Sequence, residues 1–379
     1  MNWRDDPELT ALAESAARFF EREALPERIA RWREAGQVER EFWRQAGEAG
    51  LLGVSIPAQY GGAGGDFRHD VVLVEQVGRH GVEGFALSLH NVIILPYVLA
   101  HGTEEQKRRW LPKLCSGESV AAIAMSEPGA GSDLQAIRTT AIRDGNGYRI
   151  NGAKTFISNG QIADFVILVA KTDPAAGGKG VSLLVVETDQ AEGFRRGKAL
   201  DKVGLDAQDT SELFFDDVWV PADNLLGTAE GQGFRQLMAE LPRERLVIAV
   251  SSVITMEKAV AVTTEYVKER QAFGQRVFDF QNTQFKLAEC KAKAEIARVY
   301  VDDCIARQLA GTLDLTSAAI AKLWVTDSEW QVVDECLQLH GGYGYVNDYP
   351  IARMWRNARV QRIYGGSNEI MKLLIARSL

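Results

Sequence analysis

The chain reads Ala124-Met125-Ser126-Glu127-Pro128-Gly129-Ala130-Gly131-Ser132-Asp133 at the point where helical patterning gives way to strand patterning. Glycine and proline interrupt regular structure in this stretch and leave backbone N–H groups exposed. Two small hydroxyl side chains, Ser126 and Ser132, accompany them. Such a segment suits the close approach of a planar ligand that carries anionic groups, although the same composition also describes an ordinary surface loop.

The part of the chain before this stretch, residues 1–120, has helical patterning. Asp6 can cap a helix whose first residue is Pro7, and apolar residues then recur at helical spacing. Residues 103–106, Thr-Glu-Glu-Gln, predict a capping box for another helix. The glycine-rich residues 61–66 predict a loop. We therefore expect an N-terminal helical domain over residues 1–120.

Residues 121–228 carry a different pattern. Short β-type runs at residues 164–170, 181–186 and 213–220 are separated by turn-forming sequences. The strands do not alternate with helices, which disfavours a doubly wound parallel sheet. The pattern predicts an antiparallel sheet or a small β-barrel as the middle domain.

Residues 229–379 return to helical patterning. Long helices are expected near residues 245–270, 281–309 and 317–339, followed by a short helix near Ser367. Long helices with short links favour an antiparallel bundle. The order of the three parts predicts a mostly α fold with a central β domain.

The composition excludes several classes of protein. The 379 residues are 46% hydrophobic and 25% charged, which is ordinary for a globular protein. The 43 basic and 51 acidic residues give a net charge of −8, which argues against general nucleic-acid binding. The apolar runs and the acidic N-terminus predict no membrane span, no secretory signal and no transit peptide. We therefore expect a cytoplasmic protein.

Cysteine and histidine usage argues against metal chemistry. None of the four cysteines forms a C-x-x-C pair, and the five histidines do not cluster. The sequence also lacks a G-x-G-x-x-G motif, a P-loop and an H-E-x-x-H motif. No metal ligands are expected, and any chemistry is expected to depend on a bound organic cofactor.

Six motifs occur in order along essentially the whole chain, at residues 51–66, 124–133, 151–160, 269–274, 338–344 and 363–370. Together they resemble the motifs of the acyl-CoA dehydrogenase family. The resemblance is greatest to the long-chain and isovaleryl-type subgroup. It implies an N-terminal helical domain, a middle β-barrel, a C-terminal four-helix bundle and FAD as cofactor. It also implies an acyl-CoA substrate, electron-transfer flavoprotein as electron acceptor and a homotetramer built as a dimer of dimers.

The resemblance places the flavin contacts on two segments of the middle domain. Met125 and Ser126 match backbone and hydroxyl contacts, and Phe156 and Ser158 match residues beside the flavin ring. Many family members have tryptophan at the position of Phe156, so stacking is retained here and the indole N–H donor is lost. Arg270 matches an arginine that reaches the FAD pyrophosphate of a neighbouring subunit.

Five further residues match contacts to the remainder of the cofactor. Gln281, Gln338 and Gly342 correspond to contacts with adenosine. Ser367 and Glu369 lie at the start of the last helix, whose N-terminus suits an anion. Because a carboxylate opposes a phosphate, Glu369 is expected nearer the ribose or the adenine.

At the catalytic base the chain departs from many family members. In those proteins the base follows a tyrosine that matches Tyr364, and here that position is Gly365. The long-chain and isovaleryl-type subgroup places its base where this chain has Glu244, in a segment that Pro242 is expected to kink or start. Without the loss at Gly365, Glu244 would be interpreted as a surface residue paired with neighbouring arginines. The resemblance implies that Glu244 removes the α-proton.

Four residues match contacts to the substrate. Ser132 matches a contact to the pantetheine or CoA portion, and Arg245 matches an arginine near the active centre. Gly365 retains the backbone N–H that, in the family, donates to the thioester oxygen. Gly366 follows it in the same motif.

The resulting expectation is FAD-dependent conversion of an acyl-CoA thioester to the trans-2-enoyl-CoA in fatty-acid β-oxidation. Two alternatives stay open: a flavin oxidase or monooxygenase of the same fold, and a non-catalytic acyl-CoA-binding homologue supported only by Gly365. Acyl chain length, and the choice between CoA and an acyl carrier protein, stay open as well.

Overall fold

The computed structural model describes residues 3–379, which divide into two compact units. Unit 1 contains the chain up to residue 73 with residues 82–202 and 206–240, and unit 2 contains residues 74–81, 203–205 and 241–379. Two of these boundaries fall inside helices, α4 (Phe67–His80) and α7 (Gly233–Glu269). The domain limits expected from sequence patterning, at residues 120 and 228, stay predictions.

Helices form the first part of unit 1, as the patterning predicts. Asp6 caps α1, because its side chain accepts a hydrogen bond from the backbone N–H of Glu8 at 3.0 Å. Thr103 and Gln106 form the predicted capping box of α6. Residues 61–66 form no helix or strand. Besides α4, the elements are η1 (Trp3–Asp5), α1 (Pro7–Glu23), α2 (Pro26–Ala35), α3 (Arg40–Glu48), η2 (Ala58–Tyr60), the π-helical η3 (Ser88–Ile94), α5 (Leu95–His101) and α6 (Glu104–Cys115).

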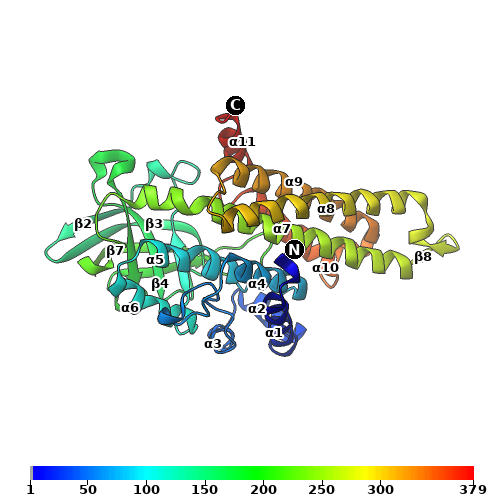
Figure 1. The fold of residues 1–379 in the computed structure, drawn as a ribbon, viewed down its shortest axis with the longest axis horizontal. Helices are drawn as coiled ribbons and strands as arrows, with labels where there is room; N and C mark the ends of the chain where they lie inside the picture. The colour runs from blue at the N-terminus through cyan, green and yellow to red at the C-terminus, as the bar shows by residue number, and fades with distance from the viewer. Residues whose placement is uncertain (1–2) are drawn as a thin grey trace. The chain divides into compact units, whose positions relative to one another are not determined.

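A seven-stranded sheet forms the second part of unit 1 (Figure 1). Its strand order is β1-β4-β2-β3-β7-β6, with β5 paired to β4. Of the two expected forms, an antiparallel sheet or a small β-barrel, the antiparallel sheet is wrong, because β4 pairs in parallel with both β1 and β2. Alternation along one strand does not specify the direction of its neighbour. The strands are β1 (Ala121–Ala124), β2 (Thr140–Asp144), β3 (Gly147–Ser158), β4 (Phe165–Lys171), β5 (Val181–Glu187), β6 (Phe194–Ala199) and β7 (Thr210–Pro221), with short 3₁₀ turns η4 (Leu134–Ala136), η5 (Pro174–Gly180), η6 (Thr188–Gln190) and η7 (Ala222–Asn224).

Strand β4 is buried on both faces and joins two parts of the core. Its residues Phe165, Ile167 and Val169 belong to a cluster that includes the apolar residues of α6. The alternate residues Val166 and Leu168 belong to a second cluster with β3, β5 and β7. The period of two along a strand sends successive side chains to opposite faces, so this one strand carries both clusters.

Long helices form most of unit 2, and α8 packs along α9 (Figure 1). A hairpin connects α7 to α8, and its turn residues Phe273 and Gly274 have φ of 52° and 81°, as a tight hairpin turn requires. The elements after α7 are β8 (Gln271–Ala272), β9 (Gln275–Arg276), η8 (Val277–Asp279), α8 (Gln281–Leu309), α9 (Leu315–His340), η9 (Gly341–Tyr345), α10 (Pro350–Ala358), η10 (Arg359–Arg362) and α11 (Asn368–Ala376).

Helix α7 corrects two expectations. It starts at Gly233 rather than near Arg245, and Pro242 lies inside it rather than at its start. It is also, by length and composition alone, apolar enough to cross a membrane, whereas the sequence analysis expects no such stretch. Within the protein, 61% of its most apolar window is buried, which is also typical of the core helix of a bundle.

Four arginines recur every third residue over α10 and η10, a pattern consistent with a subunit interface or a solvated face. All four contact their own chain, and the two alternatives stay predictions. Arg362 pairs with Asp327 at 2.6 Å, and Arg359 lies over the Trp330 ring. Arg356 donates to the Val203 carbonyl at 3.3 Å and Arg353 donates to the Asn347 carbonyl. The repeat therefore anchors α10 and η10 within unit 2.

Candidate active site

Met125 and Ser126 directly follow strand β1, and strand β3 fixes their main chain. The backbone N–H of Thr155 donates to the Ser126 carbonyl at 2.9 Å. Lys154 Nζ donates to the Met125 carbonyl at 3.0 Å. The two residues are partly exposed, so the structure holds their backbone and leaves their side chains accessible.

A buried ion pair that the sequence analysis missed supports this segment. Lys154 Nζ lies 2.9 Å from Glu127 Oε1, and both side chains are almost completely buried. Glu127 also accepts hydrogen bonds from the backbone N–H groups of Arg138 at 2.7 Å and Thr139 at 3.0 Å. Burial raises the pKa of Glu127, but these hydrogen bonds outweigh it and keep the pKa below its ordinary value. Burial lowers the pKa of Lys154 to about 8.

Phe156 directs its ring out of strand β3. Its φ of 60° is left-handed, and the pairing of β3 with β7 shifts register between Lys154 and Ile157. Such an irregularity redirects a side chain, and Phe156 is 69% exposed. Ser158 ends the same strand and is partly exposed, and Ser132 is exposed in the preceding loop. An accessible ring and accessible hydroxyl groups suit a planar, polar ligand.

Glu244 and Arg245 lie in unit 2 on α7, and both are buried. Glu244 is 6% exposed and Arg245 is 4% exposed, so Glu244 is not a surface ion-pair residue. Within residues 3–379, Arg245 Nε and Nη1 have no hydrogen-bond partner. Burial lowers the pKa of Arg245, and the charge of Glu244 opposes that shift. A buried guanidinium with free N–H groups suits an incoming anionic or carbonyl oxygen.

Gly365 and Gly366 form a turn against the same helix. Their φ values of 64° and 88° are left-handed, where glycine carries no strain. A Cβ at position 365 would lie 2.3 Å from Ile248 Cδ1, and one at position 366 would lie 3.8 Å from Arg245 Nη2. Ile248 is four residues after Glu244, so the two share a face of α7. Unit 2 therefore brings together the carboxylate position and the glycine turn that the sequence analysis singled out separately.

A second buried lysine, Lys322, fixes this turn and was also missed. Its Nζ donates to the Gly366 carbonyl at 2.9 Å and to Asn368 Oδ1 at 2.8 Å. Burial, with the nearby charge of Arg245, lowers its pKa to about 8. The signal in the sequence is a single lysine in an otherwise apolar run, Ala318-Ala319-Ile320-Ala321-Lys322-Leu323-Trp324-Val325.

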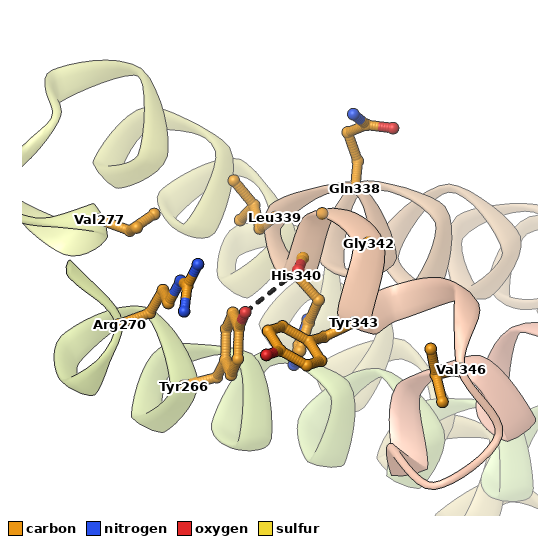
Figure 2. Close-up of a pocket in the computed structure, with 10 residues that line it drawn as sticks. Tyr266, Arg270, Val277, Gln338, Leu339, His340, Gly342, Tyr343 and Val346 are labelled. Carbon is orange, nitrogen blue, oxygen red and sulfur yellow. Dashed lines mark hydrogen bonds between the residues drawn. The ribbon is translucent and has the colours of Figure 1, made fainter. Parts of the chain in front are cut away.

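Three of the predicted adenosine and pyrophosphate contacts line one pocket of about 540 Å³ in unit 2. They are Arg270, Gln338 and Gly342, and Tyr266 and His340 join them. The Tyr266 hydroxyl donates to the His340 carbonyl at 3.2 Å, and the two rings stack at 4.2 Å (Figure 2). Figure 2 also shows that the Gln338 side chain points away from Arg270 and Tyr266, so it does not face the stacked pair.

The other predicted cofactor residues lie elsewhere in unit 2. Gln281 begins α8, is exposed and does not line the pocket. Ser367 directly precedes α11, and Glu369 lies in its first turn. The backbone N–H of Glu369 and the Ser367 hydroxyl hold the pKa of the Glu369 carboxyl below its ordinary value. An ionised Glu369 is poorly suited to a phosphate, and its position nearer a ribose or adenine stays a prediction.

The residues fit parts of FAD in each unit considered by itself. Unit 1 offers an exposed aromatic ring and hydroxyl groups for a flavin ring. Unit 2 offers a pocket with an arginine, aromatic rings and a glycine-rich wall, which suits a nucleotide with a phosphate. In the part of the chain that is described, no group of three or more His, Cys, Asp or Glu side chains could hold a metal ion.

A helical region, a mixed sheet and a helical bundle, in this order, are the fold of FAD oxidoreductases that act on acyl thioesters. The chain belongs to the acyl-CoA dehydrogenase family. The N-terminal, middle and C-terminal domains of that family match residues 6–118, 122–218 and 231–379, respectively.

Curated relatives and solved structures agree with this assignment. The chain is 46% identical to the mitochondrial long-chain specific acyl-CoA dehydrogenase of Sus scrofa, over 97% of this chain and 85% of that protein. It is 36% identical to the mitochondrial isovaleryl-CoA dehydrogenase of Solanum tuberosum, over 97% and 89%.

Two solved structures illustrate the similarity of the fold. An acyl-CoA dehydrogenase from Geobacillus kaustophilus has a TM-score of 0.97 and 46% identity, with 100% of this chain and 99% of that chain covered. A glutaryl-CoA dehydrogenase from Mycobacterium smegmatis in complex with FADH2 has a TM-score of 0.90 and 27% identity, covering 98% and 94%.

Proposed function

We propose that this chain oxidises an acyl-CoA thioester to the trans-2-enoyl-CoA, with Glu244 as the base that removes the α-proton. The observation that carries the proposal is the buried carboxylate of Glu244 on α7. It lies one turn before Ile248, and Gly365, which has no side chain, packs against Ile248. The position used by many family members has no carboxylate here, and Glu244 supplies one. Bound FAD would accept the hydride that leaves the β-carbon.

The residues of unit 2 have complementary roles in this reaction. Glu244 takes the α-proton, and its 6% exposure limits competition from water. The Gly365 N–H donates to the thioester oxygen, where negative charge develops as the proton leaves. Among the described residues, Arg245 Nε and Nη1 are buried without a hydrogen-bond partner, so their N–H groups are available to the substrate. The released proton therefore goes to a carboxylate, and the developing charge meets hydrogen-bond donors.

Cofactor binding follows from the residues already described. Met125, Ser126, Phe156 and Ser158 would hold the flavin ring, and Arg270 would meet the pyrophosphate. Gln281, Gln338, Gly342, Ser367 and Glu369 would contact the remaining half, and Ser132 and Gly366 would contact the substrate. The binding of FADH2 to a family relative with the same fold supports FAD as the cofactor.

We extend the proposal to the partners of the enzyme. Helix α8 exposes Phe285, Ile296 and Val299, at 56%, 59% and 71%. Their spacing of 11 and 3 residues places them on one face of the helix, which supports burial in a homotetramer. We also propose that electron-transfer flavoprotein accepts the electrons and that the enzyme is cytoplasmic.

Anaerobic mixing with a panel of acyl-CoA thioesters tests the function directly. The parent enzyme should lose its oxidised flavin absorbance, and Glu244→Gln should slow this reduction by roughly 10²-fold or more, because the amide cannot accept the proton. Both proteins should retain FAD and bind thioester. The measurement is stopped-flow absorbance, with FAD content and thioester affinity determined separately.

Glu240→Gln is the matched control on the same helix. Glu240 pairs with His101 at 3.0 Å. Glu240→Gln therefore tests the general effect of removing a carboxylate from α7. Its flavin should be reduced at the same rate as in the parent enzyme. Reduction of Glu244→Gln at the parental rate would exclude Glu244 as the base. Reduction accompanied by hydrogen peroxide in air would favour an oxidase, and a parent whose flavin stays oxidised with every thioester would favour a non-catalytic binding protein.

A further inference from the structure

The glycine turn at Gly365 and Gly366 has no stiffness of its own. Two consecutive glycines, both with left-handed φ, have more accessible backbone conformations than any other dipeptide. An N–H group that stabilises developing charge must nevertheless be held within a few tenths of an ångström. The surrounding residues must therefore supply the restraint that the turn lacks.

Lys322 supplies that restraint from α9. It has no exposed surface, and its Nζ donates to the Gly366 carbonyl at 2.9 Å and to Asn368 Oδ1 at 2.8 Å. One ammonium group thus joins the turn itself to the first residue of α11. Its hydrogen bonds go to neutral oxygen atoms, so it is not held there by a carboxylate.

A set of hydrogen bonds on α9 holds the other side of Asn368. Its Nδ2 donates to Thr326 Oγ1 at 3.0 Å and to Asp327 Oδ1 at 2.9 Å. Thr326 Oγ1 in turn donates to the Lys322 carbonyl at 2.8 Å. Asn368 and Thr326 are 2% and 0% exposed, so these bonds are shielded from water and fix the end of the turn.

We propose that Lys322 is a positioning residue for the Gly365 amide, and that it sets the direction of this N–H by holding the Gly366 carbonyl. The proposal rests on the proposed function, in which the Gly365 N–H donates to the thioester oxygen. A neutral donor could hold a carbonyl equally well. A buried ammonium, whose pKa is lowered by burial and then by the charge of Arg245, also adds positive charge where the substrate becomes negative.

Lys322→Met tests this role, because it retains the length of the side chain and removes the donor. Flavin reduction by acyl-CoA should slow by roughly 10- to 100-fold, with thioester affinity and FAD content nearly unchanged. The decisive readout is isotope-edited infrared spectroscopy of bound trans-2-enoyl-CoA carrying ¹³C at the thioester carbonyl. In the parent this band should lie below its position in water, and in Lys322→Met it should return toward that position.

Arg298→Met is the control for loss of a buried cation. Arg298 on α8 pairs with Glu75 at 2.7 Å and Glu257 at 2.8 Å, all within unit 2. It should lower the melting temperature without moving the carbonyl band. If Lys322→Met does not fold, Asn368→Ala serves instead, with a smaller band shift and a roughly threefold to tenfold slower reduction expected.

The outcomes separate the inference from the proposed function. A parent enzyme that no thioester reduces contradicts the proposed function, whatever the variants do. A parent that reacts, with Lys322→Met matching both its rate and its carbonyl band, overturns the inference and leaves Lys322 as an anchor of α11. A slower rate with an unmoved band also overturns it, because positioning of the amide must change the band. The same criteria apply to Asn368→Ala if it is the variant used.

Discussion

The two units hold buried charge in different ways. In unit 1, Lys154 and Glu127 pair with each other, and backbone N–H groups satisfy the remaining capacity of the carboxylate. In unit 2, Arg245 has unpartnered Nε and Nη1 atoms, and Lys322 bonds to neutral oxygens. Glu329 on α9 is fully buried, and burial raises its pKa to about 8. The Lys154–Glu127 pair of unit 1 is matched internally, whereas Arg245, Lys322 and Glu329 of unit 2 form no such pair among the described residues.

This difference separates buried charges that support the fold from buried charges that can interact with a ligand. A satisfied buried pair fixes the backbone around it, as Lys154 does for the Met125 carbonyl, and it has little capacity left for a ligand. A buried cation with free N–H groups costs stability until a ligand meets it. The Lys154–Glu127 pair is therefore expected to affect mainly whether the protein folds, and Arg245 and Lys322 to affect mainly how fast it reacts.

The largest effect is expected for Lys154→Met. It leaves the Glu127 carboxylate buried without its cation, which should lower the free energy of unfolding by about 3–5 kcal/mol. Lys322→Met should cost less, because it removes donors from neutral oxygens only. The measurement is urea unfolding followed by circular dichroism, with the two variants compared at the same pH.

The double variant Lys154→Met with Glu127→Leu is the control for this pair. Removing both charges should recover a large part of the stability that the single variant loses. If Lys154→Met and Lys322→Met unfold at the same urea concentration, the contrast between the two units is wrong.

The sequence predicts features that depend on neighbouring residues. The Asp6 cap and the Thr103 capping box depend on a few consecutive residues, and both are present in the structure. The glycine turn and Glu244 were singled out by comparison with family motifs, and the structure brings them to one face of α7.

Features that depend on contacts between residues far apart in the sequence could not be predicted from it. The parallel pairing of β1 with β4 joins residues more than 40 positions apart. The role of Lys322 depends on Asn368, on another helix 46 positions later. Pro242 predicts a kink or the start of a helix, and the start is wrong because α7 begins at Gly233 and continues through Pro242. A proline prevents one hydrogen bond, and surrounding packing decides whether that loss ends a helix.

An intermediate effect is expected for the pH dependence of Glu329. Because its pKa in the folded protein is about 8 and its ordinary value is 4.5, the folded state binds more protons than the unfolded state between these values. Stability is then lost as the pH rises, by up to about 1.4 kcal/mol per pH unit. Glu329→Gln, which cannot ionise, should lose less between pH 5 and pH 8, as measured by urea midpoints.

Glu127→Gln should show the opposite direction, because the folded-state pKa of Glu127 is lowered. The parent gains stability over this variant as the pH rises above the folded-state pKa of the carboxyl and through its ordinary range. Parallel pH profiles for the two glutamine variants would show that the two units treat their buried carboxylates alike.

The smallest effect, about tenfold, is expected from removing a steric clash after the carboxylate is moved within unit 2. Glu244→Gly with Gly365→Glu places the carboxylate on the turn, but φ at 365 is 64° and the new Cβ would lie 2.3 Å from Ile248 Cδ1. The double variant should therefore be nearly inactive. Adding Ile248→Ala removes the clash and leaves only the backbone strain, of roughly 1–2 kcal/mol. Flavin reduction should then rise about tenfold over the double variant.

Ile248→Ala alone in the parent is the control, and it should not accelerate reduction. A triple variant no faster than the double variant would mean that the backbone of the turn, not the space beside it, restricts this enzyme to a base on α7.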